Sequence, residues 1–139
     1  MIIADTGFWV ALGNDKDEYH LQAISVLEKI NDSLITTYPV ITEVCHLLLK
    51  RSGKNAMLKF IEFHFQSKDL EIFQIELSHK ARIFKLMQKY SDLPMDLADA
   101  SLVLLAEELG HGRILSTDKR DFHTYRWKNH HPFENLLTS

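Results

Sequence analysis

Short apolar runs and longer amphipathic segments alternate along the chain. Four runs have the composition of β-strands, at residues 2–4, 34–37, 70–75 and 113–116. Three of them are short and rich in Ile, Leu or Thr, which predicts strands buried on both faces of a parallel sheet. The run at 70–75 alternates apolar and polar residues better, so we expect that strand near an edge of the sheet.

Between these runs the apolar residues recur with the period of a helix. The pattern predicts five helices, at residues 20–30, 38–49, 54–66, 78–90 and 92–109.

Helix start and stop signals support these assignments. Pro39 and Pro94 fall in first turns, where a missing N–H costs nothing, and Ser78 is a candidate N-cap. Gly110 ends the last helix. In the first helix, Leu21, with the apolar residues that follow it at helical spacing, predicts a stripe facing the core.

Strands that alternate with helices indicate βαβ units. We expect an α/β fold with three layers, α/β/α, and a central, mainly parallel sheet of four or five strands. The length of 139 residues predicts one domain over residues 1–139. The less regular stretch from 123 to 139 is expected to close the edge of that domain.

Composition excludes several classes of protein. Lys and Arg number 16 and Asp and Glu 19, for a net charge of −3, which argues against binding nucleic acid through bulk charge. The single cysteine, Cys45, excludes an internal disulfide framework and fits a reducing cytoplasm. The first residues, Met-Ile-Ile-Ala-Asp, lack a basic region, and no run approaches the roughly 18 continuous apolar residues of a membrane span, so we expect no signal peptide and no membrane association.

Acidic residues follow the predicted strands. Ligands of open parallel sheets bind beyond the carboxyl ends of the strands. Asp5 follows the first strand, Glu43 lies in the helix after the second, and Asp118 follows the fourth. Asp99 is the one charged residue in Leu-Ala-Asp-Ala-Ser-Leu-Val-Leu-Leu-Ala, and Asp96 precedes it on the same helix face. A helix this apolar is buried, and a buried carboxylate must be paired, hydrogen-bonded or bound to metal.

Clustering of these acids would be costly without a cation. Two carboxylates about 4 Å apart repel by about 4 kcal/mol at an effective dielectric of about 20. Either their pKa values rise or a cation joins them. Oxygen ligands without cysteine suit Mg²⁺ or Mn²⁺, which can activate water and stabilise charge on a phosphodiester. The pattern therefore predicts metal-dependent phosphoryl hydrolysis.

Each acid also has a plainer interpretation. Asp5 or Asp118 taken alone is a cap or turn residue, and Asp99 is a buried acid bonded to backbone or to a hydroxyl. We interpret Asp96 as a cap of its helix and Asp121 as a cap of the turn at Phe122. The joint placement of four acids at one edge of the sheet is what favours a site.

Other acid-based classes fit less well. Two Glu-x-x-His pairs, Glu43/His46 and Glu76/His79, have the spacing used in di-iron helical bundles, but a bundle needs four long helices that contribute ligands. An aspartyl phosphatase would need an acid at Gly7, and a receiver-like module would need an acidic pair where Asp5 stands alone.

Several segments together resemble the PIN domain family, and in particular its small VapC-like toxins. The matching segments are Ile-Ile-Ala-Asp-Thr at 2–6, Val-Ile-Thr-Glu-Val at 40–44, Leu-Pro-Met-Asp-Leu-Ala-Asp-Ala at 93–100 and Ile-Leu-Ser-Thr-Asp-Lys-Arg-Asp-Phe at 114–122. His20 also matches a recurrent position. Order, spacing and context agree over essentially the full chain.

The resemblance implies an α/β/α fold and cleavage of RNA that depends on Mg²⁺ or Mn²⁺. Asp5 and Asp99 would be the principal metal ligands, and Asp118 would hold a second or substrate-loaded ion. Glu43 would ligate through water or position the attacking water. The supporting residues would be Thr6 and Ser116 through hydrogen bonds, together with Asp96. The resemblance also implies a homodimer and a small antitoxin as partner.

The rival interpretation is a PIN-like domain that binds RNA or a partner without cutting it. Basic residues cluster at 50–59 and at 119–128, where they would hold phosphates if they flank the acids. A complete acid set favours the enzyme, because a domain that only binds has no need to keep carboxylates that repel each other.

Overall fold

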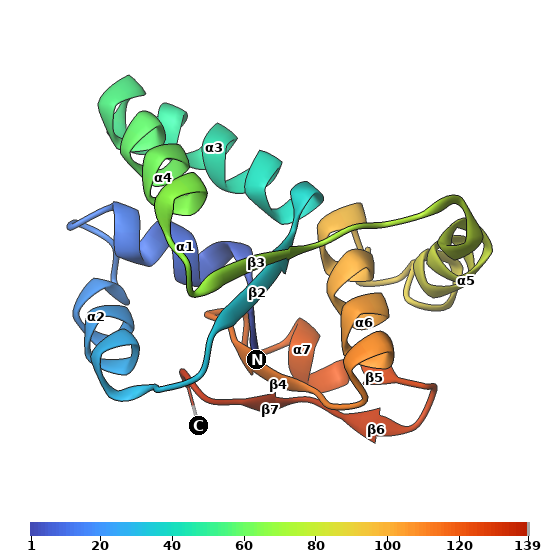
Figure 1. Ribbon diagram of the computed structural model, residues 1–139. Coiled ribbons are helices and arrows are strands. Elements are labelled where there is room, and N and C mark those ends of the chain that lie inside the picture. Colours follow the sequence, from blue (N-terminus) through green and yellow to red (C-terminus); the bar gives the residue numbers. More distant parts are fainter. Residues whose placement is uncertain (139) are drawn as a thin grey trace.

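Five parallel strands form the centre of the molecule. The structure is a computed structural model that describes residues 1–138. The order of strands across the sheet is β3-β2-β1-β4-β7 (Figure 1). The strands are β1 (Ile2–Ala4), β2 (Leu34–Thr37), β3 (Leu70–Phe73), β4 (Arg113–Leu115) and β7 (Glu134–Asn135).

Helices cover both faces of this sheet. From β1 the chain moves outward through β2 to β3, and it then crosses back to β4 and on to β7. Because such connections are right-handed, the two directions place their helices on opposite faces. One face carries α1 (Thr6–Gly13), α2 (His20–Lys29), α3 (Tyr38–Ser52) and α4 (Lys54–Gln66); the other carries α5 (Lys80–Lys89), α6 (Leu97–Leu109) and α7 (Asp121–Thr124) (Figure 1).

Smaller elements complete the chain. A 3₁₀ turn, η1 (Leu77–His79), leads into α5. The strands β5 (Arg126–Trp127) and β6 (His131–Pro132) form an antiparallel hairpin after α7. No helix in the described chain is long and apolar enough to cross a membrane.

The α/β/α architecture and the four predicted strands are confirmed. The third strand lies at an edge, as expected, and the chain after residue 123 closes the opposite edge with β7. β3 stops at Phe73 because its partner β2 ends at Thr37, where the chain turns into α3. β4 stops at Leu115 because the N–H of Ser116 donates to the side chain of Asn135 rather than to a backbone carbonyl of the neighbouring strand.

Two predicted helix starts are wrong. The helix predicted at 92–109 begins only at Leu97, because Pro94 lies in a preceding turn and Asp96 caps α6. Ser78 is not an N-cap; Glu76 and His79 form a capping box around η1, and α5 begins at Lys80.

The pattern also missed two helices, α1 and the four-residue α7, and misplaced one residue. α1 is buried nearly all round, so it shows no amphipathic period. Asp5 caps it, since the Asp5 side chain accepts from the N–H of Thr6. Leu21, expected in the core, is 80% exposed, and Ala23 is the buried residue of α2.

The core fixes the two helices that matter most for the acids. In α6 every residue from Ala100 to Ala106 is buried. In α1, Phe8 and Trp9 are buried and meet edge to face, with ring centroids 5.3 Å apart. Each large buried apolar side chain contributes about 1.5–3 kcal/mol. The N-terminal ends of both helices are therefore held firmly at the carboxyl edge of the sheet.

Candidate metal centre

The acids gather where the direction of the chain reverses in the sheet. β1 and β4 are neighbours, but the connection that leaves β1 and the one that leaves β4 run in opposite directions. A crevice forms beyond the carboxyl ends of such a strand pair. Asp5 follows β1 directly, and Ser116 and Asp118 follow β4. The first turn of α6 brings Asp99 to the same edge.

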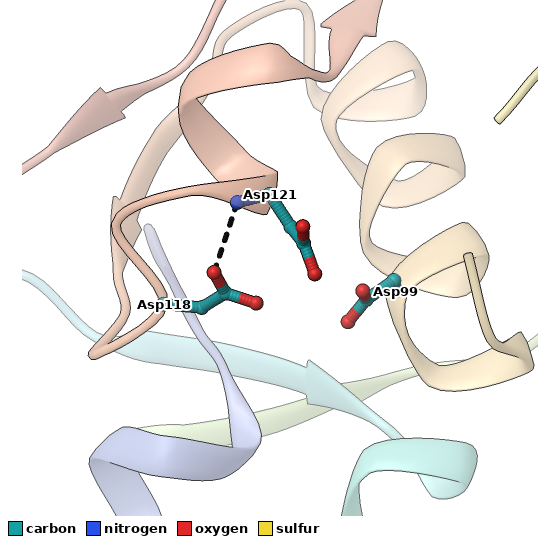
Figure 2. Close-up of side chains that lie close together, drawn as sticks. All are labelled: Asp99, Asp118 and Asp121. Atoms are coloured by element: carbon teal, nitrogen blue, oxygen red, sulfur yellow. Dashed lines mark hydrogen bonds between the residues drawn. The ribbon is translucent and has the colours of Figure 1, made fainter. Parts of the chain in front are cut away.

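Three carboxylates from separate elements meet in this crevice. One side-chain oxygen each from Asp99, Asp118 and Asp121 lies within 4.8 Å of the other two. Figure 2 shows Asp99 extending from α6 toward Asp118, in the loop after β4, and Asp121, at the start of α7.

A short chain of hydrogen bonds positions Asp118 and Asp121. The N–H of Asp121 donates to Asp118 Oδ1 at 2.9 Å (Figure 2). The N–H of Asp118 donates to Ser116 Oγ at 3.0 Å. Arg120 Nε donates to Asp121 Oδ1 at 2.8 Å and supplies a positive charge at the rim.

Ser116 also connects this pair to Asp5. The Asp5 side chain is 5% exposed, and its two oxygens have separate donors. The N–H of Thr6 donates to Oδ1 at 2.7 Å, and Ser116 Oγ donates to Oδ2 at 2.8 Å. One buried hydroxyl thus donates to Asp5 while it accepts from the backbone of Asp118.

Asp99 is held from two sides. Its N–H donates to Asp96 Oδ1 at 2.8 Å, which is the N-cap of α6. Its own Oδ2 accepts a hydrogen bond from the Tyr125 hydroxyl at 2.7 Å. Burial is the largest cause that raises the pKa of Tyr125, so this phenol stays a proton donor.

Burial and mutual repulsion make the carboxylates hard to ionise without a cation. Burial raises the pKa of Asp5 to about 7, with repulsion from Asp118 and Glu43 as smaller causes. Burial and then repulsion from Asp5 raise the pKa of Asp99 to about 8. Burial also raises the pKa of Asp118. A positive ion would reverse these shifts by favouring the charged forms.

Glu43 and Thr6 lie at the α3 side of the site. Burial raises the pKa of the Glu43 carboxyl, and repulsion from Asp96 adds to that rise. The Thr6 hydroxyl is buried, and no described residue hydrogen-bonds it. Such a group calls for a water or a ligand as partner.

The donor set fits a hard divalent cation. All side-chain atoms of the three-carboxylate cluster that could bind a metal ion are oxygens. The buried Thr6 hydroxyl is an additional polar group without a hydrogen-bond partner among the described residues. Mg²⁺ and Mn²⁺ prefer such carboxylate and water oxygens.

The structure brings most of the residues singled out from the sequence to one place. Asp5, Asp99, Asp118 and Ser116 share the crevice; Asp96 caps α6 beside Asp99, and Glu43 and Thr6 adjoin from the other face of the sheet.

Two residues at the site were missed. Asp121 was interpreted as a cap, but its carboxylate caps no helix and lies in the cluster instead. Its place three residues after Asp118, across one turn, was a usable signal. Tyr125 is 26 residues from Asp99, and nothing in the sequence pattern pairs them.

Comparisons with known proteins identify the family. The model of the PIN domain matches residues 2–128. Ribonuclease VapC26 of Mycobacterium tuberculosis is 24% identical over 125 residues, which cover 90% of this chain and 92% of that protein. The crystal structure of Mycobacterium tuberculosis VapC20, described as a toxin that cleaves the sarcin–ricin loop, matches with a TM-score of 0.79 at 20% identity and covers 86% of this chain and 92% of that one. The family match extends over most of the sequence, and the chain belongs to the PIN domain family.

Proposed function

We propose that this protein is an endoribonuclease that depends on Mg²⁺ or Mn²⁺ and serves as the toxin of a toxin–antitoxin pair. The observation that carries the proposal is the meeting of Asp99, Asp118 and Asp121 within 4.8 Å at the chain-reversal crevice of a PIN domain. The names of the relatives, a ribonuclease and a toxin that cleaves the sarcin–ricin loop, support the same substrate class.

The acids divide into two roles. Asp99, Asp118 and Asp121 would hold the cation, together with the buried Asp5, which lies near Asp118. When bound, such an ion polarises water and stabilises the charge that develops on a phosphodiester. The network of Thr6 N–H, Ser116 Oγ and Asp5 fixes the buried carboxylate in place, so binding needs little rearrangement.

Glu43 is our candidate for handling the proton of the attacking water. It lies at the opposite side of the site, on α3, and its raised pKa makes it a better proton acceptor than an exposed glutamate. Lys119 and Arg120 are exposed and directly follow Asp118, where they would contact flanking phosphates of the RNA.

The proposal extends to partners and setting. We propose a homodimer, a small antitoxin protein as inhibitor, and action in the cytoplasm. The description of the relative VapC20 as a toxin is compatible with an inhibitory partner. The free cysteine, Cys45, is compatible with a reducing cytoplasm.

Cleavage of mixed cellular RNA by the purified protein tests the function. We expect cutting with Mn²⁺ or Mg²⁺, no cutting with EDTA, and loss of activity in Asp99→Asn. Asp92→Asn is the matched control, because Asp92 is an exposed aspartate in the turn before α6. RNA that is bound by the wild type but uncut under either metal would instead support the non-catalytic RNA-binding or partner-binding domain.

A further inference from the structure

Tyr125 makes the one side-chain hydrogen bond to the Asp99 carboxylate within residues 1–138. The ring is fully buried, and its hydroxyl reaches Asp99 Oδ2 at 2.7 Å. We propose that Tyr125 is a positioning residue that holds the Asp99 carboxylate in its metal-binding orientation. This inference rests on the proposed function, since it assigns a partner to a proposed ligand of the cation.

The hydrogen bond restricts a carboxylate that would otherwise rotate. The Asp99 side chain extends from the first turn of α6 toward Asp118 and Asp121 (Figure 2). With Oδ2 bonded to Tyr125, the other oxygen, Oδ1, accepts no hydrogen bond from any described residue. That oxygen is therefore available to a cation, and the bonded one fixes the plane of the group. Partners of this kind commonly set the orientation and affinity of metal ligands.

Tyr125 is itself packed and hydrogen-bonded on several sides. Its ring meets Tyr90 at 5.0 Å between centroids with 70° between planes, and it meets Phe122 at 5.0 Å with 89°. Its backbone N–H donates to the carbonyl of Asp121 at 2.9 Å. One residue thus contacts Asp99 through its side chain and, through its backbone, the turn that carries Asp121.

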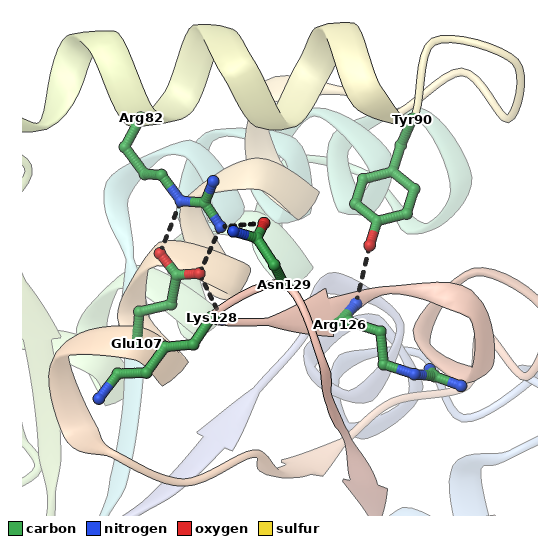
Figure 3. Close-up of polar contacts among 6 residues, drawn as sticks. All are labelled: Arg82, Tyr90, Glu107, Arg126, Lys128 and Asn129. Carbon is green, nitrogen blue, oxygen red and sulfur yellow. Dashed lines mark hydrogen bonds and ion pairs between the residues drawn. The ribbon is translucent and has the colours of Figure 1, made fainter.

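The strand that follows Tyr125 is fastened at both ends, as Figure 3 shows. At its start, the N–H of Arg126 donates to the Tyr90 hydroxyl at 3.0 Å. Just past its end, the N–H of Lys128 donates to Glu107 Oε2 at 2.6 Å. Arg82 from α5 holds Glu107 in turn, with Nε and Nη2 at 2.9 and 2.6 Å from its two oxygens.

This anchoring ties Tyr125 to the same helix that carries its partner. Glu107 and Asp99 both lie on α6, so the strand and the carboxylate are fixed to one rigid element. The Tyr125 hydroxyl that donates to Asp99 is also electrically neutral. A lysine or arginine at this position would orient the carboxylate too, but its positive charge would oppose binding of a divalent cation.

Calorimetric titration of the intact protein with Mn²⁺ tests the assignment. Tyr125→Phe keeps the ring packing and removes only the hydroxyl. We expect its Mn²⁺ affinity to fall 10- to 100-fold, the usual effect of removing a group that orients a metal ligand. Tyr19→Phe is the matched control, because it removes a phenol oxygen from a residue that precedes α2, on the other face of the sheet, and that does not hydrogen-bond Asp99. Its Mn²⁺ affinity should match that of wild type, because the partner that orients Asp99 is unchanged.

RNA cleavage measured against Mn²⁺ concentration adds a second criterion. For Tyr125→Phe we expect the half-saturating Mn²⁺ concentration to rise and most of kcat to return at saturating metal. A merely structural role would lower Tm in EDTA and leave half-saturation unchanged, which would overturn the inference.

The outcomes separate this inference from the proposed function. Wild type and Tyr125→Phe binding Mn²⁺ equally, with Asp99→Asn impaired, would overturn the role of Tyr125 and leave the metal site standing. Wild type binding Mn²⁺ no better than Asp99→Asn would overturn both.

Discussion

At the scale of single residues, the site combines carboxylates that repel each other with donors that hold them still. Ser116 illustrates the arrangement, because its one hydroxyl donates to Asp5 and accepts from Asp118. The hydrogen bonds fix the positions of the acids, but burial still raises the pKa values of Asp5 to about 7 and Asp99 to about 8. The metal-free protein must therefore lose stability when these groups ionise.

The stability of the metal-free protein is expected to fall as pH rises from 6.5 to 8.5. In the unfolded chain an aspartate binds its proton only below about pH 4, whereas folded Asp5 and Asp99 keep theirs to about 7 and 8. The folded state thus binds more protons across this window, so the free energy of unfolding decreases with pH, by about 2–3 kcal/mol. Burial lowers the pKa values of His64 and His111, and the opposite contribution of these histidines falls mainly below the window.

Urea unfolding in EDTA at four pH values would measure this slope. Asp92→Asn, which alters an exposed acid, should keep the slope, and Asp99→Asn should flatten it. A stability that rises over the same range would contradict the shared burial of the acids.

Asp99→Asn gives a second prediction at this scale. The amide keeps the shape of the side chain and can still accept from Tyr125, but it removes a buried charge from the cluster. At pH 8 without metal we expect Tm to rise by a few degrees, which corresponds to about 1 kcal/mol. Stabilisation by Mn²⁺ should disappear. Thermal melts with and without Mn²⁺ measure both effects. Equal stabilisation of the wild type and the variant by Mn²⁺ would contradict a metal site that includes Asp99.

At the scale of elements, the carboxyl edge depends on a close approach between α1 and the loop after β4. A Cβ placed on Gly7 would lie 1.9 Å from Thr117 Oγ1 and 3.1 Å from Thr117 Cβ. Gly7 follows the cap of α1, and Thr117 directly precedes Asp118. The absence of a side chain at position 7 therefore lets the two acid-bearing segments meet.

Gly7→Ala is expected to destabilise the protein by about 1–3 kcal/mol and to weaken Mn²⁺ binding, because the side chain of Thr117, next to Asp118, must shift. In an open helix the same change would stabilise by about 1 kcal/mol. Urea unfolding and calorimetry report the two effects. The double variant Gly7→Ala, Thr117→Ala removes the closest atom and should recover much of the loss. A single variant more stable than wild type would show that the contact is unimportant.

The sequence predicts elements better than it predicts contacts between them. The strands at 2–4 and 34–37 have the bounds expected, because a run buried on both faces is apolar throughout. α1 was not predicted, and the reason is again burial: a helix buried all round has no polar face, so its apolar residues do not recur with a helical period. The acids after the strands were found through strand topology alone. Tyr125 was not, because its bond to Asp99 depends on how the chain after α7 returns across α6.

At the scale of the whole molecule, the strand order gathers groups from both faces of the sheet. Glu43 comes from α3 on one face, and Asp99 comes from α6 on the other. The resulting acidic centre lies in a protein whose net charge is already −3. RNA must therefore be attracted by a few local cations rather than by the overall field.

The two basic clusters are not equivalent in this architecture, and salt dependence distinguishes them. Lys119 directly follows Asp118, whereas Lys54 lies where α3 passes into α4, at the end of α3 far from β2 (Figure 1).

Binding of single-stranded RNA to Asp99→Asn, which should not cut it, is expected to weaken with salt. Each phosphate contact contributes about −0.7 to the slope of log K against log salt concentration. In that background Lys119→Ala should make the slope shallower by about 0.7, and Lys54→Ala should leave it unchanged. Fluorescence anisotropy at several salt concentrations measures both slopes. A larger effect of Lys54→Ala would contradict an RNA path along the acidic crevice, because removing a lysine makes the slope shallower only when that lysine contacts an RNA phosphate.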